Sequence, residues 1–396
     1  MPRAAGTREG LTLIFLSMLP IMAIAGLVAD LPVLLRVFGH EPHHEIVVPM
    51  VLTIPSLCVA LFAPVAGVIA DRWGRRPLLL LALLAFSLLG LAPLLFTSFP
   101  AILASRVVVG LAEASILTCT NALWGDYFPD DARRRWLGLQ QMSGPVFNAL
   151  LALAGGALAT LHWSRPFWLY ALGLVAFGFA AMVLWEPARA EGAPARAEGA
   201  PAANAGSPFP WATAGRIAAV TFGVSIVFFT LAIQQGRIFA ALGVVSPAVN
   251  GQLIMAVSLA AIVGAVVFNR LRQRPTAQLL ALGLLSYGVG YIGIAQSTNV
   301  VPGALASALA QFGSSIVLPA LIAWTLASFL PEHRGRGIGL WGAVFFAGQF
   351  FSAPLLTGLE HLQGDLLGAL ALVGGATLLA AGAAIWFNRQ PVVSGK

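Results

Sequence analysis

The chain has 396 residues, of which 59% are hydrophobic and 9% are charged, and its formal net charge is +7. Soluble domains are about half apolar and a quarter charged, and disordered chains are apolar-poor, so both classes are excluded. A helix of about 20 apolar residues spans a bilayer, so this composition indicates a multi-pass membrane protein. The basic residues stand singly or in threes between apolar runs, which argues against a nucleic-acid partner and for a lipid bilayer.

In chain order, apolar runs predict twelve membrane-spanning helices. The first run begins near residue 11, and its length favours an uncleaved helix over a cleaved signal peptide. Residues 186–210 form a polar tract rich in Ala, Gly and Pro, which cannot bury a core and predicts a flexible linker. We therefore expect an all-α membrane protein with one six-helix bundle over 1–185 and a pseudo-symmetric second bundle over 211–396. The expected spans are 11–36, 46–70, 78–97, 100–125, 137–160, 166–185, 211–236, 247–268, 276–296, 300–329, 338–359 and 365–387.

Basic residues are distributed unevenly between the two sides of these spans. Of the 22 Lys and Arg, eighteen fall in segments, or at ends of spans, on the side of the N-terminus, and one, Arg106, lies deep within a span. The remaining three, Arg36, Arg165 and Arg237, fall on the opposite side. Because basic residues are retained on the cytoplasmic side, we expect a protein of the cell membrane with both termini in the cytoplasm.

The loop after the second span carries the most specific motif. Residues 67–76 read Gly-Val-Ile-Ala-Asp-Arg-Trp-Gly-Arg-Arg, and a weaker copy of this loop follows the eighth span. Asp71 ends a helix, where the helix dipole disfavours an anion, so a cation such as Arg75 is expected beside it. Gly67 would let a neighbouring helix approach closely.

This loop closely resembles the cytoplasmic loop signature of the major facilitator superfamily. The twelve spans, the central linker and the half-chain repeat extend the resemblance to essentially the whole chain. It implies a secondary active transporter that works by alternating access, with a conformational latch at this loop. In the family the loop also engages an acid at the end of helix 4, where Asp126 stands here. The latch residues implied are Gly67, Asp71, Arg72, Gly74, Arg75, Arg76 and Asp126.

Two further resemblances concern the branch of the family. The chain is most similar to drug exporters, although their Gly-Pro-x-x-Gly-Gly pattern on helix 5 is interrupted here, because Gly144-Pro145 is followed by Gly155-Gly156 only ten residues later. The run from Gly110 to Ser115 is similar, more weakly, to spinster-like lysolipid transporters. That branch usually has Gly where Ala112 stands.

The fourth span contains two charged residues, Arg106 and Glu113. Each charge at mid-bilayer costs about 2.5–3.5 kcal/mol on insertion scales, so such residues are functional by default. They lie on one line of the helix, about 10.5 Å apart along its axis, too far for a direct bridge. Asp30 has a similar depth to Arg106 and is the expected partner across helices, with a purely structural ion pair as the alternative. Arg106-x-x-x-Gly110 resembles the family motif associated with proton coupling, which implies that Glu113 couples transport to a proton gradient and that no cofactor is needed.

Two groups of polar residues remain. The loop from His40 to Glu45 has ligand types that suit zinc or copper, but Pro42 and the short spacing define no coordination geometry, so a solvated loop without metal is favoured. Uncharged polar residues at middle depth are candidates for the substrate cavity, with helix–helix hydrogen bonding as the alternative. These candidates are Asn148, Gln234, Gln235, Gln311, Trp324 and Gln349.

The expected function is secondary transport of a small organic or amphipathic molecule, with export favoured and a monomer as the expected state. Lysolipid or sphingolipid transport and proton-coupled uptake of an organic solute are the alternatives. A membrane-embedded enzyme is disfavoured, because it would need clustered His or Asp, or a Ser or Cys beside His, and the expected spans contain no histidine. A channel is disfavoured by the duplicated architecture.

Overall fold

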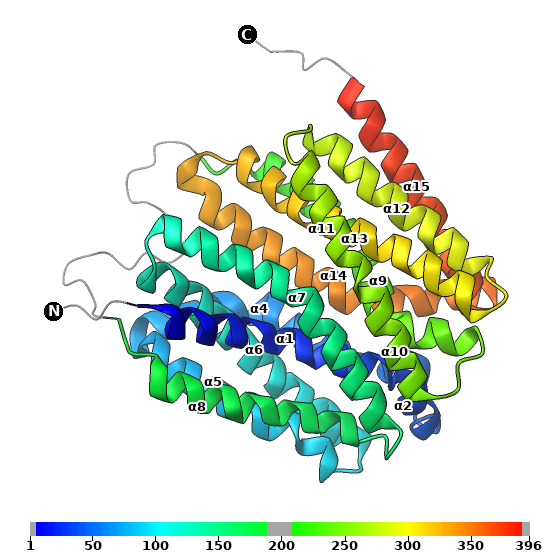
Figure 1. The fold of residues 1–396 in the computed structure, drawn as a ribbon, viewed down its shortest axis with the longest axis horizontal. Helices are drawn as coiled ribbons and strands as arrows, with labels where there is room; N and C mark the ends of the chain where they lie inside the picture. Colours follow the sequence, from blue (N-terminus) through cyan, green and yellow to red (C-terminus); the bar gives the residue numbers. More distant parts are fainter. Residues whose placement is uncertain (1–4, 188–207, 390–396) are drawn as a thin grey trace.

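The structure is a computed structural model that describes residues 5–187 and 208–389. Over these residues the chain forms helices and turns without a strand, and twelve of its helical segments are long and apolar enough to cross a membrane. The expected all-α membrane fold is therefore confirmed (Figure 1). The first part comprises α1 (Thr7–Val28), α2 (Leu31–Val37), α3 (His44–Val47), α4 (Met50–Trp73), α5 (Arg75–Gly90), η1 (Ala92–Leu94), α6 (Phe99–Tyr127), α7 (Asp130–Ala159), η2 (Arg165–Ala171) and α8 (Leu172–Val183).

The second part follows segment 188–207, which holds most of the expected linker and lies outside the described residues. Its helices gather beside the first set, as the yellow-green-to-red ribbons in Figure 1 show. They are α9 (Trp211–Ala241), α10 (Pro247–Ser258), α11 (Ala260–Leu271), α12 (Thr276–Ala295), α13 (Val300–Ser328), η3 (Pro331–His333), α14 (Arg334–Gln363) and α15 (Leu366–Arg389).

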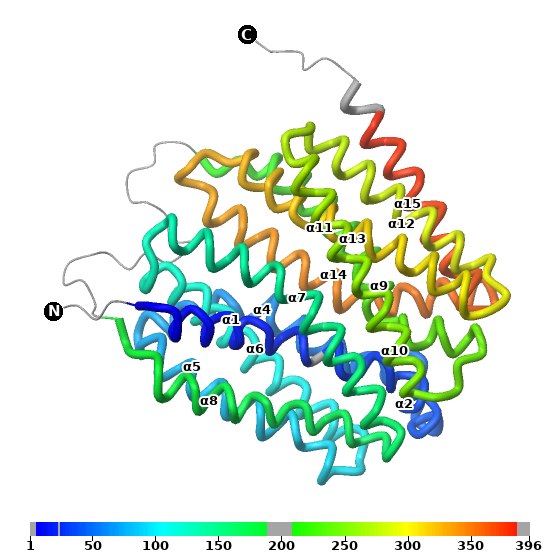
Figure 2. Tube along the Cα trace, in the orientation of Figure 1, coloured from blue at the N-terminus to red at the C-terminus, as the bar shows by residue number. Residues whose placement is uncertain are grey.

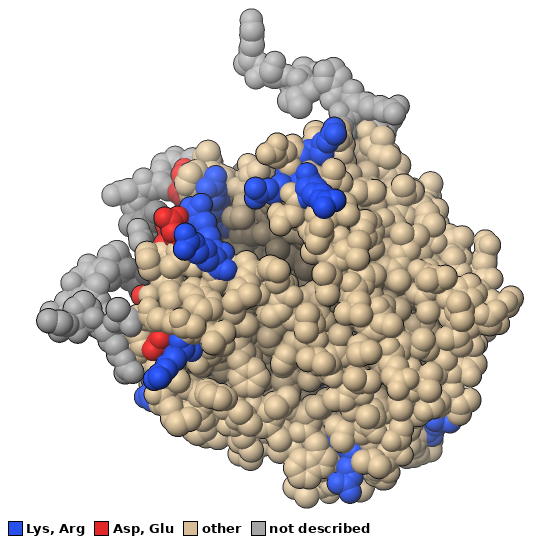
Figure 3. Space-filling model, viewed as in Figure 1, with Lys and Arg blue, Asp and Glu red and all other residues tan. Residues whose placement is uncertain are grey.

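The two sets of helices pack against each other at one end only. We call the end where α1 begins and α8 ends the linker end, and the opposite one the far end. α7 packs along α10 but scarcely touches α11, although α10 and α11 together form one span. α4 also packs on α14, and α1 and α2 on α9. Because α10 is the far-end part of its span, the bundles meet at the far end and separate towards the linker end, where Figure 3 shows a hollow between two groups of basic side chains.

Glycines allow the close contact at the far end. A methyl group added to Gly156 on α7 would lie 2.5 Å from the carbonyl oxygen of Pro247 and 2.9 Å from the Cα of Gly251. Both distances are shorter than carbon atoms tolerate. The backbones of α7 and α10 therefore touch directly, as small residues permit between membrane helices. We call the whole far-end contact between the bundles the far-end seam.

The first span is broken, contrary to the expectation of one helix over 11–36. α1 ends at Val28 and α2 begins at Leu31 (Figure 2). Pro32 has no N–H and cannot donate to the carbonyl of Val28 four residues earlier. The N–H of Val33 donates instead to the carbonyl of Asp30 at 2.8 Å, which leaves the carbonyl of Ala29 outside the helix pattern. The break therefore frees two backbone carbonyls, those of Val28 and Ala29.

The eighth span also differs from the expected continuous helix over 247–268. It divides into α10 and α11 at Leu259, directly after Ser258. The Ser258 hydroxyl donates to the carbonyl of Ile254 at 2.8 Å, a contact that bends helices. The bend coincides with the level at which α7 and this span diverge.

The eleventh span is longer than expected. α14 runs to Gln363, whereas the hydropathy pattern placed the end of this span at 359. Glu360 and His361 are therefore helical residues at the far end, which corrects the expectation that the spans hold no histidine. The physical reason is that His361 reaches water while Glu360 is paired with Arg237, so the backbone continues as helix beyond the apolar run.

Candidate functional site

The latch residues lie at the linker end. Arg75 at the start of α5 forms an ion pair with Asp126 near the end of α6, in agreement with the implied contact to helix 4. Asp71 and Arg72 occupy the last turn of α4, four and three residues before Arg75. Gly74 separates α4 from α5 with φ of 101°, a conformation that strongly favours glycine. The structure thus brings the charged loop and the end of α6 together.

Glu186 completes this cluster and was not expected from the sequence. Its two carboxylate oxygens accept the backbone N–H groups of Arg75 and Arg76 at 2.8 and 2.7 Å. A carboxylate at a helix N-terminus satisfies orphan donors and interacts favourably with the dipole. A methyl group at Gly74 would lie 2.9 Å from a Glu186 oxygen, so glycine also makes room for this cap. The Arg76 guanidinium in turn donates to the carbonyl of Ala181 at 2.8 Å, which ties α5 to the end of α8.

The close helix approach expected at Gly67 occurs elsewhere. A methyl group at Gly67 would meet Thr118 at 3.8 Å, an ordinary contact. At Gly110 on α6, the added methyl would lie 2.6 Å from the Cα of Pro55 and 2.7 Å from the Cβ of Cys58, both on α4. Gly110 is therefore the residue that lets α4 and α6 touch, one turn away from Glu113.

Arg106 does not meet Asp30, contrary to expectation. Its side chain is fully buried, and its Nη2 donates to the carbonyls of Leu89 and Gly90 at 2.9 and 3.1 Å, where α5 ends. The rings of Phe167 and Tyr170 flank its guanidinium at 5.1 and 5.0 Å. The C-terminus of α5 and the two aromatic rings both stabilise the positive charge of Arg106. Arg106 therefore needs no acidic partner such as Asp30. We call this set of contacts the arginine cage.

Asp30 lies instead at the break between α1 and α2. Its side chain has 0% exposure, and neither carboxylate oxygen has a hydrogen-bond partner among the described residues. Asn250 of α10 donates from Nδ2 to the adjacent carbonyl of Ala29 at 3.2 Å and to that of Gly236 on α9 at 3.1 Å. The broken helix is thereby fastened to the opposite bundle. Asp30 belongs to the far-end seam.

Glu113 is buried where α6 contacts α4. It has 4% exposure, and its Oε1 has no hydrogen-bond partner in the described part of the chain. Burying an ionised carboxylate without a partner is costly. Its position two turns from the arginine cage on the same helix is the one expected from the sequence.

The expected cavity residues divide into two groups. Asn148 on α7 donates to Ser258 at 3.0 Å, at the bend where the bundles begin to diverge, and Gln311 and Trp324 on α13 are half-buried. Gln234, Gln235 and Gln349 are almost fully buried. Gln234 accepts a hydrogen bond from Arg237. The structure therefore favours helix packing over cavity lining for the buried group.

Three polar contacts at the far end were missed by sequence reasoning. Arg237 pairs with Glu360 inside the second bundle, and the His361 Nε2 lies 3.5 Å from a Glu45 carboxylate oxygen across the bundles. The third is Asn250. Asn250 could have been found from the sequence, because an amide within an apolar run is unusual. The two ion pairs could not have been found, because each joins residues that are too distant in sequence for a local pattern to reveal the contact.

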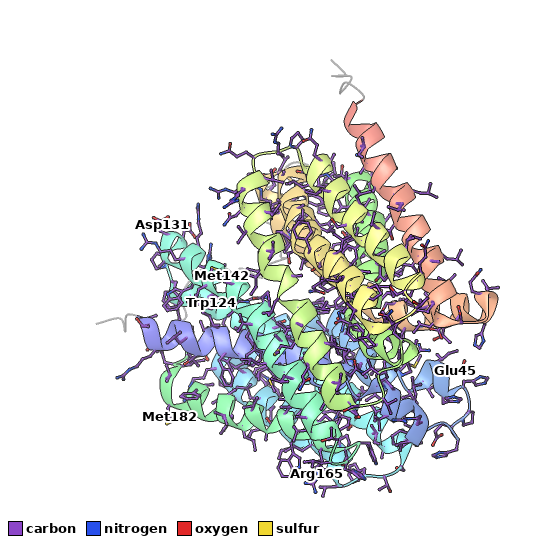
Figure 4. The ribbon with its side chains drawn as sticks, turned by 45° about the vertical axis from the view of Figure 1, so that its right-hand side comes forward. Glu45, Trp124, Asp131, Met142, Arg165 and Met182 are labelled. Carbon is purple, nitrogen blue, oxygen red and sulfur yellow. The ribbon has the colours of Figure 1, made fainter. Side chains whose placement is uncertain are left out.

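The histidine-rich loop turns towards this seam through Glu45, which Figure 4 places at the far end, opposite Asp131. His40 is exposed and lies 3.6 Å from Glu41. Over the described ranges, no three His, Cys, Asp or Glu side chains form a group that could hold a metal ion. Through Glu45 the loop contributes to the contact between the bundles.

Comparison with known proteins agrees with the twelve-helix fold. Residues 10–244 and 217–396 each match the sequence model of the Major Facilitator Superfamily. The chain is 30% identical over 166 residues to the bacillibactin exporter of Bacillus subtilis (strain 168), covering 39% of this chain and 40% of that protein. It is 32% identical over 145 residues to the class C tetracycline resistance protein of Escherichia coli, covering 35% and 34%. The chain thus matches well under half the length of these curated relatives.

Solved structures share the fold over nearly the full chain. A bacterial homologue of the human lysosomal transporter Spinster, in an inward-facing conformation, gives a TM-score of 0.76 at 18% identity, covering 96% of this chain and 95% of that chain. A D-xylose–proton symporter gives 0.73 at 15% identity and covers 98% of each chain. At such identities these likenesses establish the fold alone. The family match over both halves, with the charged loop and the two bundles in place, makes this chain a multi-pass membrane transporter that belongs to the major facilitator superfamily.

Proposed function

We propose that this transporter is a proton-driven exporter of the cell membrane that moves a small organic or amphipathic molecule by alternating access. The observation that carries the coupling is Glu113, an acid buried at the contact of α4 and α6 without a hydrogen bond to Oε1. An acid in such a place is suited to exchange a proton when its surroundings change between water and protein.

Alternating access is supported by the way the bundles meet. The far-end seam is closed by glycine contacts and a few hydrogen bonds, while α7 and α11 stand apart at the linker end. Such a joint can close at one end as it opens at the other without rebuilding either bundle. The excess of arginines at the linker end supports the cytoplasmic placement of that end, and with it an inward-open state.

Export is supported by the names of several relatives, which are resistance proteins for tetracycline and chloramphenicol and an exporter of bacillibactin. The weaker alternatives are lysolipid or sphingolipid transport and proton-coupled uptake of an organic solute. Substrate recognition by the half-buried Asn148, Gln311 and Trp324 is consistent with a molecule that has both aromatic and hydrogen-bonding parts.

The test uses full-length protein in sealed vesicles with an imposed pH gradient. Tetracycline, chloramphenicol, a lysophospholipid and 3-hydroxyphenylpropionate serve as probes of the competing substrate classes. Glu113→Gln should bind the transported probe with unchanged affinity and exchange it without a gradient, yet lose accumulation driven by the gradient. Glu41→Gln, in the far-end loop, is the control and should behave as wild type. Undiminished proton-driven transport by Glu113→Gln would refute the coupling role, and loss of binding would assign Glu113 to a cationic substrate.

A further inference from the structure

A groove of about 670 Å³ lies at the far end of the first bundle, where η1 contacts η2. Its apolar wall consists of Leu91, Leu94, Leu95, Leu161 and Trp168. Leu95 and Leu161 are 83% and 73% exposed. In Figure 1 the helices next to this groove, α5 and α8, form the edge of the molecule away from the second bundle. Exposed leucines beside a tryptophan at the end of a span lie where acyl chains meet lipid headgroups.

The polar part of the groove offers hydrogen-bond donors. Arg165, which Figure 4 shows at the far end, is exposed and forms no ion pair with any described residue. The backbone N–H of Ser164 donates to Nδ1 of His162 at 3.3 Å, so the neutral imidazole carries its proton on Nε2 and is a donor there. The described residues that line the groove include no acid. A guanidinium and an imidazole therefore stand beside an apolar wall without a negative charge among them.

The position of Arg165 also runs against the distribution of basic residues in this chain. Only Arg36, Arg165 and Arg237 fall on the far side, where membrane topology disfavours basic residues. Arg237 is matched by Glu360. Arg165 is not matched by any acid in the groove, and a groove with a cation at one part and leucines at the other is complementary to an amphiphile with a negative head.

We propose that this groove binds one phospholipid with a net negative headgroup from the leaflet on the far side. The parallel N–H groups of the Arg165 guanidinium match two phosphate oxygens, and Nε2 of His162 is a further donor. One acyl chain then covers the exposed leucines, whose burial favours binding. A zwitterionic headgroup would add an ammonium group for which the groove has no acid, so a negative headgroup is preferred.

The bound lipid would join the two segments that hold the arginine cage. η2 contributes Arg165 to the groove and Phe167 to the cage. The end of α5 contributes Leu91 to the groove, and the carbonyl of Gly90 accepts from Arg106. A ligand that binds these segments only in their native arrangement stabilises the folded protein. The lipid is therefore expected to raise the stability of the first bundle.

The site is tested on full-length protein that has been purified in detergent and freed of lipid. Native mass spectrometry counts the bound molecules, and thermal unfolding reports the stabilisation. The probes are phosphatidylglycerol, phosphatidylethanolamine and sn-glycerol 3-phosphate, of which the last separates a lipid site from a site for soluble phosphate. We expect one tightly bound phosphatidylglycerol that raises the unfolding temperature, with phosphatidylethanolamine bound about tenfold more weakly, as one unmatched charge implies. The soluble phosphate should neither bind nor stabilise.

Variants of the groove separate charge from shape. Arg165→Gln should weaken phosphatidylglycerol binding about tenfold, as loss of a charge-assisted contact implies, yet unfold at the wild-type temperature without lipid. Arg165→Lys keeps the charge and should retain most of the binding. Leu95→Glu places an acid in the groove and should abolish binding, whereas Leu95→Gln, of similar size but uncharged, should keep most of it. Arg36→Gln is the matched control, because Arg36 is exposed on the same side but does not line the groove.

Several results would overturn the site. They are equal binding of the two lipids, equal binding by Leu95→Glu and Leu95→Gln, and a loss in Arg36→Gln as large as in Arg165→Gln. Binding of sn-glycerol 3-phosphate as tight as that of the lipid would also overturn it in favour of a soluble phosphate. The experiment uses neither a pH gradient nor a transported molecule, so its outcome is independent of the coupling role proposed for Glu113.

Discussion

Arg237 near the end of α9 and Glu360 near the end of α14 form a bidentate ion pair, with Nη1–Oε1 at 2.9 Å and Nη2–Oε2 at 2.8 Å. Both side chains are mostly buried, at 16% and 13% exposure. Parallel donors and acceptors of this kind hold two side chains in one fixed geometry. The pair joins α9 and α14, two of the three helices that form the second bundle's side of the far-end seam, the third being α10.

We expect Glu360→Gln to lower the free energy of unfolding by about 1.5–3 kcal/mol, because it leaves a partly buried guanidinium without its counter-charge. The double exchange Arg237→Glu with Glu360→Arg should recover most of the loss. Thermal unfolding in detergent measures both variants. A double exchange that is no better than the single change would show that the geometry, rather than the charge pair, is what the helices require.

Gly236→Ala should weaken the closed far end. The added methyl would collide with the carbonyl of Val28, the group freed by Pro32. Gly223→Ala on the same helix is the matched control, because a methyl there meets nothing within 4 Å. Alanine favours helices by about 1 kcal/mol over glycine, so the control should be neutral or stabilising. Spin-label distances across the far end should lengthen for Gly236→Ala only, and equal distances in both variants would contradict the contact.

Arg106→Lys should destabilise the first bundle while leaving substrate affinity within about twofold. Lysine keeps the charge but loses the planar group that lies between two rings and donates to two carbonyls, which costs about 2 kcal/mol. Arg165→Lys, at an exposed position, should leave the unfolding temperature unchanged. A variant of Arg106 that stays stable but loses transport would move this arginine from a structural to a coupling role.

The Arg75–Asp126 pair should set the rate of transport more than binding. Arg75→Ala removes one side of a partly exposed pair, worth about 1 kcal/mol or roughly fivefold in a two-state balance. Initial transport rates and equilibrium binding of the same probe separate the two effects. The exchange Arg75→Asp with Asp126→Arg should restore part of the rate. Weakened binding at an unchanged maximal rate would argue against a latch.

Glu186→Gln tests the cap that joins α5 to the end of the first bundle. The amide still reaches the backbone but loses the charge, so we expect a loss of about 1 kcal/mol in unfolding free energy. Glu9→Gln is the control, since Glu9 also accepts a backbone N–H, that of Gly6 at 2.8 Å, but only within its own helix start. If both variants lose the same unfolding free energy, the contact of Glu186 with a helix distant in sequence adds no stability beyond that of a local cap.

Two kinds of feature were readable from the sequence. The spans follow from hydropathy, because a membrane helix must be apolar wherever its neighbours lie. The charged loop was recognisable because its residues are contiguous, and the Arg75–Asp126 contact followed from the family pattern. Hydropathy and the charged loop are local properties of the chain, whereas the Arg75–Asp126 contact was available only through the family pattern.

The partners of the buried charges were decided only by the tertiary structure. Depth alone placed Arg106 near Asp30, but the rotation of α6 turns Arg106 towards α5 and η2, and hydropathy contains no information on rotation. The far-end seam likewise joins Asn250 to Ala29, 221 residues apart. The sequence by itself therefore determined the class, the number and approximate positions of the spans, and the latch loop, but not the breaks at Ala29 and Leu259. Packing decided which carbonyls, aromatic rings and amides lie next to each buried charge. Those neighbours come from other helices, and the rotation of each helix relative to the next depends on the whole bundle.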